Sequence, residues 1–181
     1  MAIWFWIFML YSFIGFVLEV LFALATGNPK RDRKCLYFLP LCPVYGLGAL
    51  FILVLPAPVQ ENPFFLFLLG GLAATASELF MGLFYERLAG VRFWDYRHLP
   101  FQVGGQVCLL FTGIWGLLSL GLVYLIHPLV EGLVSEIPHW LTLPAALFLA
   151  VDSTLTMLVL RRERHTDALK WYASRHKASQ P

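Results

Sequence analysis

Long apolar runs separated by short polar or proline-rich connections make up most of the chain. Five runs have the length of a membrane-spanning helix, which needs about 20 residues. The predicted spans are about residues 3 to 26, 43 to 59, 63 to 85, 105 to 127 and 140 to 160. The short alternating segments of a membrane β-barrel are absent. The pattern therefore predicts an all-α transmembrane bundle in residues 1–160, followed by a basic cytoplasmic tail in 161–181.

Composition strengthens the membrane assignment and excludes several function classes. Hydrophobic residues make up 59% of the chain and charged residues 13%, whereas charged residues make up about 25% of soluble domains. The sequence contains no phosphate-binding loop, no zincin motif and no serine-hydrolase motif. We therefore expect no cofactor, no metal and no nucleic-acid partner. Any energy source has to be an ion gradient or a separate ATPase subunit.

Basic residues fall in only three of the segments between or after the spans. All 13 lysines and arginines follow the first, third or fifth predicted span, whereas the other two connections contain Glu61, Glu131 and Glu136. By the positive-inside rule, the N-terminus is predicted outside and the C-terminus in the cytoplasm. The outer connection at 128–137 has apolar residues at helical spacing, which predicts a short helix on the outer surface.

Three carboxylates lie inside predicted spans that all run from outside to inside. Glu19, Glu78 and Asp152 are each about 12 to 14 Å from the cytoplasmic end of their span, at 1.5 Å per residue, and so near the bilayer midplane. An ionised carboxylate there costs at least about 2.5 to 3.5 kcal/mol, and no span contains a lysine or arginine. A shared cavity with proton uptake or cation binding is the main site hypothesis.

The alternative is that each carboxyl group is satisfied separately. On this interpretation Tyr11 or Ser12 binds Glu19, and Thr75 binds Glu78. The buried acids would then only fix the positions of the helices.

The connection after the third span, "FWDYRHLPFQVGGQ", combines membrane-interface residues with less expected ones. Trp94 and Tyr96 are typical of an aromatic belt, and its arginines satisfy the positive-inside rule. Asp95 is predicted to cap a helix, to pair with an arginine, or to bind a ligand; with His98 it makes only a weak metal signal. Glu86, just before this connection, is predicted to pair with the arginine that follows it.

Four segments carry a resemblance to a known family. "YSFIGFVLEV", "LPLCPVYGLGAL", "SELFMGLFYERLAGVRFWDY" and "PFQVGGQVCLL" resemble, in order and spacing, the small bacterial proteins of the putative ABC-transporter type IV family, over about residues 8 to 130. The resemblance implies a multi-pass protein of the bacterial cytoplasmic membrane and brings no catalytic residues. Its pattern marks Glu19, Cys42, Pro43, Tyr45, Gly46, Glu78, Glu86, Trp94, Asp95 and Tyr96.

The chain departs from the family pattern in two places. It has "RKCLYFLP" where the family reads N-R-G-F-L-Y-G-P, and Gln106 stands where the family has an arginine. Without that arginine a charge-paired carboxylate site is in doubt, although Gln106 can still donate hydrogen bonds.

These observations lead to three hypotheses. The first is a permease-like transport subunit with a midplane carboxylate site. The second is a membrane enzyme that acts on lipid-linked substrates near the cytoplasmic face, with Glu78, Glu86 and Asp95 as acid/base groups. The third is a membrane scaffold without a substrate. The predicted substrate or ion site comprises Glu19, Glu78, Glu86, Asp95, Tyr96, Gln106 and Asp152. Because such a bundle is slim, we also expect a homo-oligomer or a partner subunit.

Overall fold

The computed structural model describes residues 2–27 and 34–170, and within them the regular secondary structure is helical apart from one short strand pair. Strands β1 (Gln102–Val103) and β2 (Val107–Cys108) pair antiparallel. The all-α fold class is confirmed. Within the described ranges, four helical segments are long and apolar enough to cross a membrane: Ala2–Ala25, Pro63–Ala89, Leu109–Ser135 and His139–Glu163.

Three of these segments combine shorter elements. The first segment is α1 alone. The second consists of α4 (Pro63–Phe65), a π-helical stretch Leu66–Gly70 and α5 (Gly71–Ala89). The third consists of α6 (Leu109–Gly121), a π-helical stretch Leu122–Ile126 and α7 (His127–Ser135). The fourth consists of a 3-10 turn His139–Leu141 and α8 (Thr142–Glu163). A second 3-10 turn, Thr166–Leu169, follows α8.

The second predicted span forms a shorter helix than expected. Helix α2 (Pro43–Leu53) has 11 residues, and a separate helix α3 (Ala57–Glu61) follows it. At 1.5 Å per residue, α2 is about 16 Å long, roughly half of a hydrocarbon core. Pro56 and Pro58 lack the backbone N–H that a continuing helix needs. A crossing over 43–59 is therefore not confirmed, and the count of five spans and the orientation of the termini stay predictions.

The predicted outer surface helix is not a separate element. Helix α7 continues α6 through the π-helical stretch, which precedes Pro128, and a local π-helical adjustment lets a helix pass a proline. Val130 and Val134 of α7 are buried in a cluster with Ile7 and Tyr11 of α1. The segment therefore packs against the first helix instead of lying alone on the surface.

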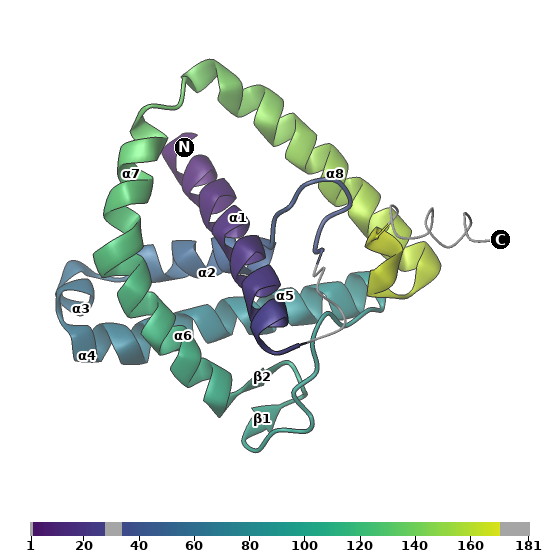
Figure 1. Ribbon diagram of the computed structural model, residues 1–181, viewed down its shortest axis with the longest axis horizontal. Coiled ribbons are helices and arrows are strands. Elements are labelled where there is room, and N and C mark those ends of the chain that lie inside the picture. The colour runs from purple at the N-terminus through teal and green to yellow at the C-terminus, as the bar shows by residue number, and fades with distance from the viewer. Residues whose placement is uncertain (1, 28–33, 171–181) are drawn as a thin grey trace.

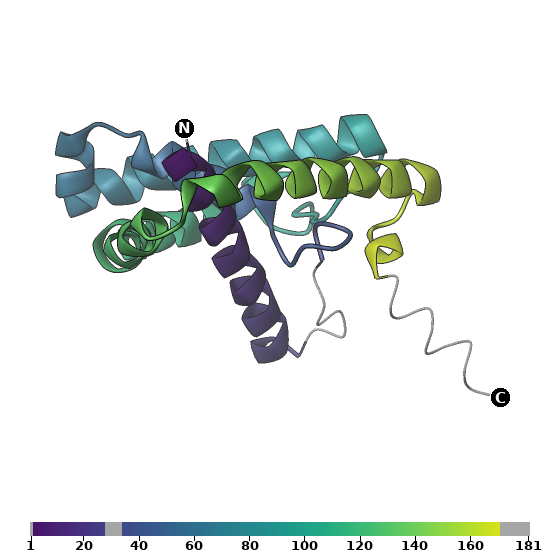
Figure 2. The ribbon, with the colours of Figure 1, turned by 90° about the horizontal axis from the view of Figure 1, so that it is seen from above.

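Helix α1 packs against α2, and in Figure 1 it passes in front of α5. Helices α2 and α5 run side by side, while α6 with α7 and the long α8 lie on opposite sides of the molecule. Figure 2 shows α1 projecting away from the layer that contains α2 and α5. The strand pair lies at the bottom of Figure 1, the 34–41 loop and the end of α8 lie toward its right, and the connections predicted outside lie toward its left and top. Residues 171–181, most of the predicted basic cytoplasmic tail, lie outside the described residues.

Glycines bring α6 into close contact with α5 and with the π-helical stretch that precedes α5. A Cβ atom on Gly116 would lie 2.6 Å from the carbonyl oxygen of Phe67, and one on Gly71 would lie 2.9 Å from that of Thr112. Both distances are below any real Cβ contact, so only glycine permits this approach. Small residues at helix contacts are typical of membrane proteins, where close backbone packing drives association.

We expect Gly116→Val to lower the free energy of unfolding by about 1 to 3 kcal/mol, because overpacking forces the two helices apart. Gly113→Val on the same helix is the matched control, since a Cβ there meets no atom within 4 Å. Thermal unfolding of the purified protein in detergent compares the two variants. Equal melting temperatures would contradict the close approach.

Candidate functional site

Glu78 lies on α5 with its carboxylate held by two neutral donors. The residue is 3% exposed. The Tyr96 hydroxyl donates to Oε1 at 2.7 Å, and the Trp115 indole N–H donates to Oε2 at 2.9 Å. The alternative prediction that Thr75 binds Glu78 was wrong, because the Thr75 hydroxyl donates to Thr112 instead. Among the described residues, no lysine, arginine or histidine forms an ion pair with Glu78.

Tyr96 is suited to remain a donor. Burial, with the Glu78 carboxylate beside it, raises the pKa of Tyr96 well above its ordinary value. The ring also stacks on Phe111, with centroids 4.6 Å apart. The hydroxyl therefore keeps its proton and its orientation toward Glu78 at physiological pH.

Glu19 lies on α1 and accepts a hydrogen bond from the Tyr45 hydroxyl at 2.8 Å. The alternatives predicted from sequence, Tyr11 and Ser12, do not make this bond. The Tyr11 hydroxyl lies 3.4 Å from Nδ1 of His127, and the Ser12 side chain packs against α2 at Gly46. A donor to Glu19, the Tyr45 hydroxyl, therefore comes from the next helix in the sequence.

Residues 42–46, "CPVYG", position that donor. Pro43 occupies the first turn of α2, and the preceding Cys42 donates its backbone N–H to the carbonyl oxygen of Ser12 at 2.9 Å. A Cβ on Gly46 would lie 2.2 Å from Oγ of Ser12, so glycine is required where α1 and α2 touch. The segment therefore fixes the start of α2 against α1, which places Tyr45 beside Glu19.

The two aromatic donors contact each other. The rings of Tyr45 and Trp115 pack edge to face with centroids 5.2 Å apart. Glu19, Tyr45, Trp115 and Glu78 thus form one continuous chain of contacts across four helices. The structure therefore brings together the two carboxylates for which the sequence predicted a shared cavity.

A cleft of about 750 Å³ adjoins this chain of contacts. Its walls include both carboxylates and their donors, together with side chains from the 34–41 loop, the 90–108 loop and the turn after α8. The charged and polar lining residues are Glu19, Lys34, Tyr45, Glu78, Arg92, Trp94, Asp95, Tyr96, His98, Trp115, Thr166, Asp167 and Lys170. The cleft thus extends from the two helix carboxylates to the loops that are predicted to be cytoplasmic.

Asp95 and Trp94 stabilise the loop that carries Tyr96. The Trp94 indole donates to the carbonyl oxygen of Gln106 at 2.8 Å. Arg97 donates to Asp95 from Nε at 2.8 Å and Nη2 at 2.5 Å, and its backbone N–H also donates to that carboxylate at 3.0 Å. Of the roles predicted for Asp95, pairing with an arginine is the one that this geometry shows. No group of three metal-ligating side chains occurs in the described residues.

The Asp95–Arg97 pair predicts a defined acid dependence. Hydrogen bonds from Arg97 lower the pKa of Asp95 from 3.8 to about 2. Because the folded-state pKa is lowered, the pair contributes stability above pH 4, and this contribution is lost as the pH falls from about 4 to 2. We expect the melting temperatures of wild type and Asp95→Asn to differ by a constant amount from pH 8 to 5 and to converge below pH 4. A difference that changes between pH 8 and 5 would contradict the assignment.

Glu86 is held by residues of the same loop, and not by the adjacent arginine as predicted. Arg92 donates to Oε1 from Nε at 2.9 Å and from Nη2 at 2.5 Å, and the Gln106 amide donates to Oε2 at 2.5 Å. Glycine at position 82 leaves room for this amide, since a Cβ there would lie 2.1 Å from Oε1 of Gln106. Gln106 therefore serves as a neutral donor where the family pattern has an arginine.

Asp152 lies apart from the two other helix carboxylates. It is fully buried on α8, and its two oxygens accept the backbone N–H groups of Phe38 and Leu39 at 2.9 and 2.8 Å. The neighbouring Thr156 accepts the backbone N–H of Tyr37 at 2.9 Å. In the described part of the chain, Asp152 fastens a loop to α8 and is not among the residues that line the cleft.

Trp115 is the site residue that sequence reasoning missed. It stands in "FTGIWGLLSLG", which reads as a packing segment of small residues, and 37 positions separate it from Glu78. The one available signal is that a buried indole N–H requires an acceptor, and acceptors are scarce in an apolar helix bundle. That signal does not say which acceptor is used.

The arrangement places two helix carboxylates in the wall of one cleft, and two neutral donors hold that of Glu78. A family model described as Putative ABC-transporter type IV matches residues 6–159, which confirms the resemblance seen in the motifs. The chain matches no curated protein and no solved structure.

Proposed function

Because the chain belongs to the Putative ABC-transporter type IV family and has several apolar helices of membrane-spanning length, we propose that it is the membrane subunit of a transporter. In this proposal Glu19 and Glu78 bind the transported or coupling cation, and a separate ATPase supplies the energy. The membrane is the bacterial cytoplasmic membrane, with the cleft open to the cytoplasm.

The environment of Glu78 is the observation that carries this proposal. Its two oxygens accept hydrogen bonds from neutral groups, Tyr96 and Trp115. Neutral donors orient a carboxylate but do not neutralise it, and an uncompensated charge inside a membrane is expensive. A proton or a cationic ligand supplies the missing charge. The binding of a proton or a cation is therefore favourable partly because it neutralises the carboxylate of Glu78.

The cleft supports transport over the two other hypotheses. An enzyme near the headgroups would need Glu86 and Asp95 available for proton transfer, yet each is hydrogen-bonded to an arginine. A scaffold would need its buried acids satisfied without a cleft, whereas Glu19 and Glu78 both line one. Asp152, with its two backbone donors, shows how this same fold satisfies a carboxylate whose role is structural.

The tip of the 90–108 loop supports contact with a partner. Phe101 is 79% exposed and Val103 is 65% exposed, and both lie outside the four long apolar segments. Exposed apolar side chains beside the arginines of this loop suit a protein interface at the membrane surface. We assign this tip as the site where the ATPase binds.

Photo-crosslinking and isolation test the proposal. A benzoylphenylalanine residue at Phe101 of the tagged full chain is irradiated in the cells that express it natively. The chain is then isolated and assayed for ATP hydrolysis. We expect an ATPase subunit to crosslink at position 101 and not at Leu129, an exposed position on α7. Isolation of the chain with no crosslinked ATPase and no ATP hydrolysis would overturn the proposed function.

A further inference from the structure

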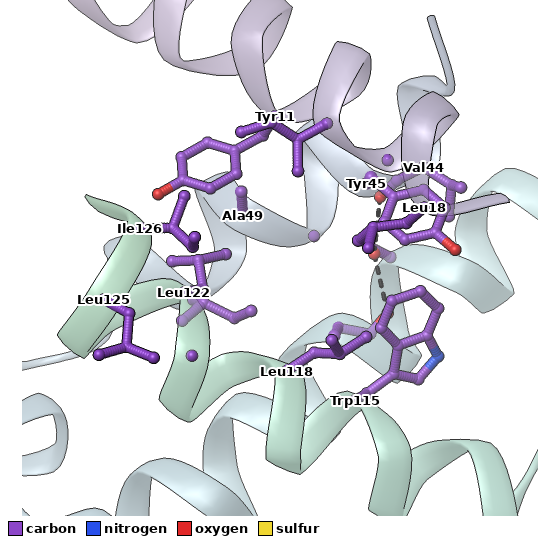
Figure 3. A pocket seen from close by; sticks show the side chains of 17 residues that line it. Tyr11, Leu18, Val44, Tyr45, Ala49, Trp115, Leu118, Leu122, Leu125 and Ile126 are labelled. Atoms are coloured by element: carbon purple, nitrogen blue, oxygen red, sulfur yellow. Dashed lines mark hydrogen bonds between the residues drawn. The ribbon is translucent and has the colours of Figure 1, made fainter. Parts of the chain in front are cut away.

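A second, apolar pocket lies on the other side of the Tyr45–Trp115 pair (Figure 3). It has a volume of about 300 Å³ and is lined mainly by aliphatic side chains of α1, α2 and α6 and of the π-helical stretch after α6. Figure 3 shows Tyr45 and Trp115 at one side of it and Leu122, Leu125 and Ile126 at the other. The volume is at the lower end of the range of about 300 to 1,000 Å³ for ligand pockets.

The pocket offers little to a polar ligand. Its hydroxyl groups are already engaged within the fold, since Ser77 donates to the carbonyl oxygen of Ala74 at 2.8 Å and the Tyr11 hydroxyl contacts His127. The remaining lining is hydrocarbon and aromatic. The pocket therefore accepts an alkyl chain or another apolar group.

The pocket and the cleft share part of their walls. Leu18, Val44, Tyr45, Trp115 and Leu118 line both. On the cleft side of this shared wall lie the two carboxylates, and on the pocket side lies hydrocarbon. A molecule that occupies both compartments must therefore carry its apolar and its polar parts on opposite ends.

We propose that the substrate is a cationic amphiphile, with its alkyl chain in the apolar pocket and its positively charged head beside Glu19 and Glu78. This inference rests on the proposed function, and it names the chemical class of the substrate. The head is cationic because neutral donors leave the carboxylate of Glu78 without a positive partner. An anionic head would add a second negative charge beside it.

The two parts of the ligand contribute differently to selection. Lipid tails are as apolar as the pocket, so moving an alkyl chain from the bilayer into the pocket gains little hydrophobic free energy. The pocket therefore selects by shape and fixes the direction of the chain. The carboxylates select by charge and supply most of the affinity.

A glycine pair allows the chain site to be tested without disturbing helix packing. Gly121 lines the pocket, and a Cβ there meets no atom within 4 Å. Gly113, two turns earlier on α6, has equally open surroundings but does not line the pocket. Gly121→Leu fills the pocket, and Gly113→Leu is the matched control with the same change in sequence.

The experiment measures binding of radiolabelled decyltrimethylammonium to the full chain in lipid nanodiscs, with empty nanodiscs as the blank. We expect saturable binding that unlabelled decyltrimethylammonium displaces and that decyl sulfate does not. Tetramethylammonium, which lacks the chain, is expected to compete at least about tenfold more weakly. Gly121→Leu, and separately Glu19→Gln with Glu78→Gln, are expected to weaken binding at least about tenfold, and Gly113→Leu to leave it unchanged.

Equal competition by decyl sulfate, or equal binding by the two glycine variants, would overturn the inference. The outcome is independent of the crosslinking test for the ATPase. A chain that crosslinks to an ATPase but binds no decyltrimethylammonium contradicts this substrate class and retains the transport function. A chain that binds the probe but has no ATPase supports the amphiphile site and contradicts the transport function.

Discussion

Replacing Glu78 with alanine is expected to lower the free energy of unfolding by about 2 to 6 kcal/mol. The substitution leaves the Tyr96 hydroxyl and the Trp115 indole N–H without their acceptor inside the protein. Each buried donor that loses its partner costs about 1 to 3 kcal/mol. Thermal unfolding of the purified protein in detergent measures the loss as a lower melting temperature.

Glu78→Gln is the control, and it separates the hydrogen bonds from the charge. The glutamine carbonyl can accept from Trp115, and its amide can donate to the oxygen of Tyr96, so each partner keeps one hydrogen bond to residue 78. We expect the free energy of unfolding of Glu78→Gln to lie within about 1 kcal/mol of that of wild type, which is less than the usual cost of leaving a buried donor without a partner. We also expect this variant to lose cation binding. An alanine variant as stable as the glutamine variant would contradict the assigned hydrogen bonds.

Asp152→Ala is expected to destabilise the protein to a similar extent, for a structural reason. Both oxygens of Asp152 accept backbone N–H groups, from Phe38 and Leu39, and the residue is fully buried. Bonds to a charged acceptor are worth about 1.5 to 3 kcal/mol each, so removing both costs about 3 to 6 kcal/mol. The melting temperature should fall, and the loop at 34–41 should become accessible to protease.

The response to an amide distinguishes Asp152 from Glu78. In Asp152→Asn one carboxylate oxygen is replaced by an NH2 group. This donor faces a backbone N–H, which is also a donor, so the variant should be clearly less stable than wild type. Thr154→Ala on the same helix removes only an exposed bond to the carbonyl oxygen of Ala150 and serves as the control. If Asp152→Asn matched wild type while retaining cation binding, the loop-fastening role would be wrong.

Depth along the helices was readable from the sequence, but the partners of the carboxylates were not. Counting residues from the polar connections identified Glu19, Glu78 and Asp152 as deep in the apolar segments. Nothing in the count distinguished Asp152, whose donors are loop N–H groups more than 110 positions away. Backbone donors are present at every residue except proline, so no side-chain pattern reveals which of them a buried acid uses.

Local sequence also misassigned contacts that depend on loop geometry. Adjacent arginine and glutamate suggested an ion pair for Glu86, yet consecutive helix residues do not face each other, and Arg92 reaches Glu86 from the following loop. The apolar run at 43–59 predicted a full span, although its prolines end α2 at Leu53. The family motifs, by contrast, were recognisable from short segments, and the family match confirms them.

The central claim is that a cleft leads from the cytoplasm to Glu19 and Glu78. Cysteine accessibility tests it most directly, using Glu19→Cys in a chain whose Cys35, Cys42 and Cys108 are replaced by alanine. Leu21→Cys, exposed on α1 but outside the cleft, is the control. We predict that a membrane-impermeant maleimide labels position 19, and not position 21, in inverted vesicles and labels neither in right-side-out vesicles. Protection of position 19 from both sides, or labelling only from outside, would contradict the account.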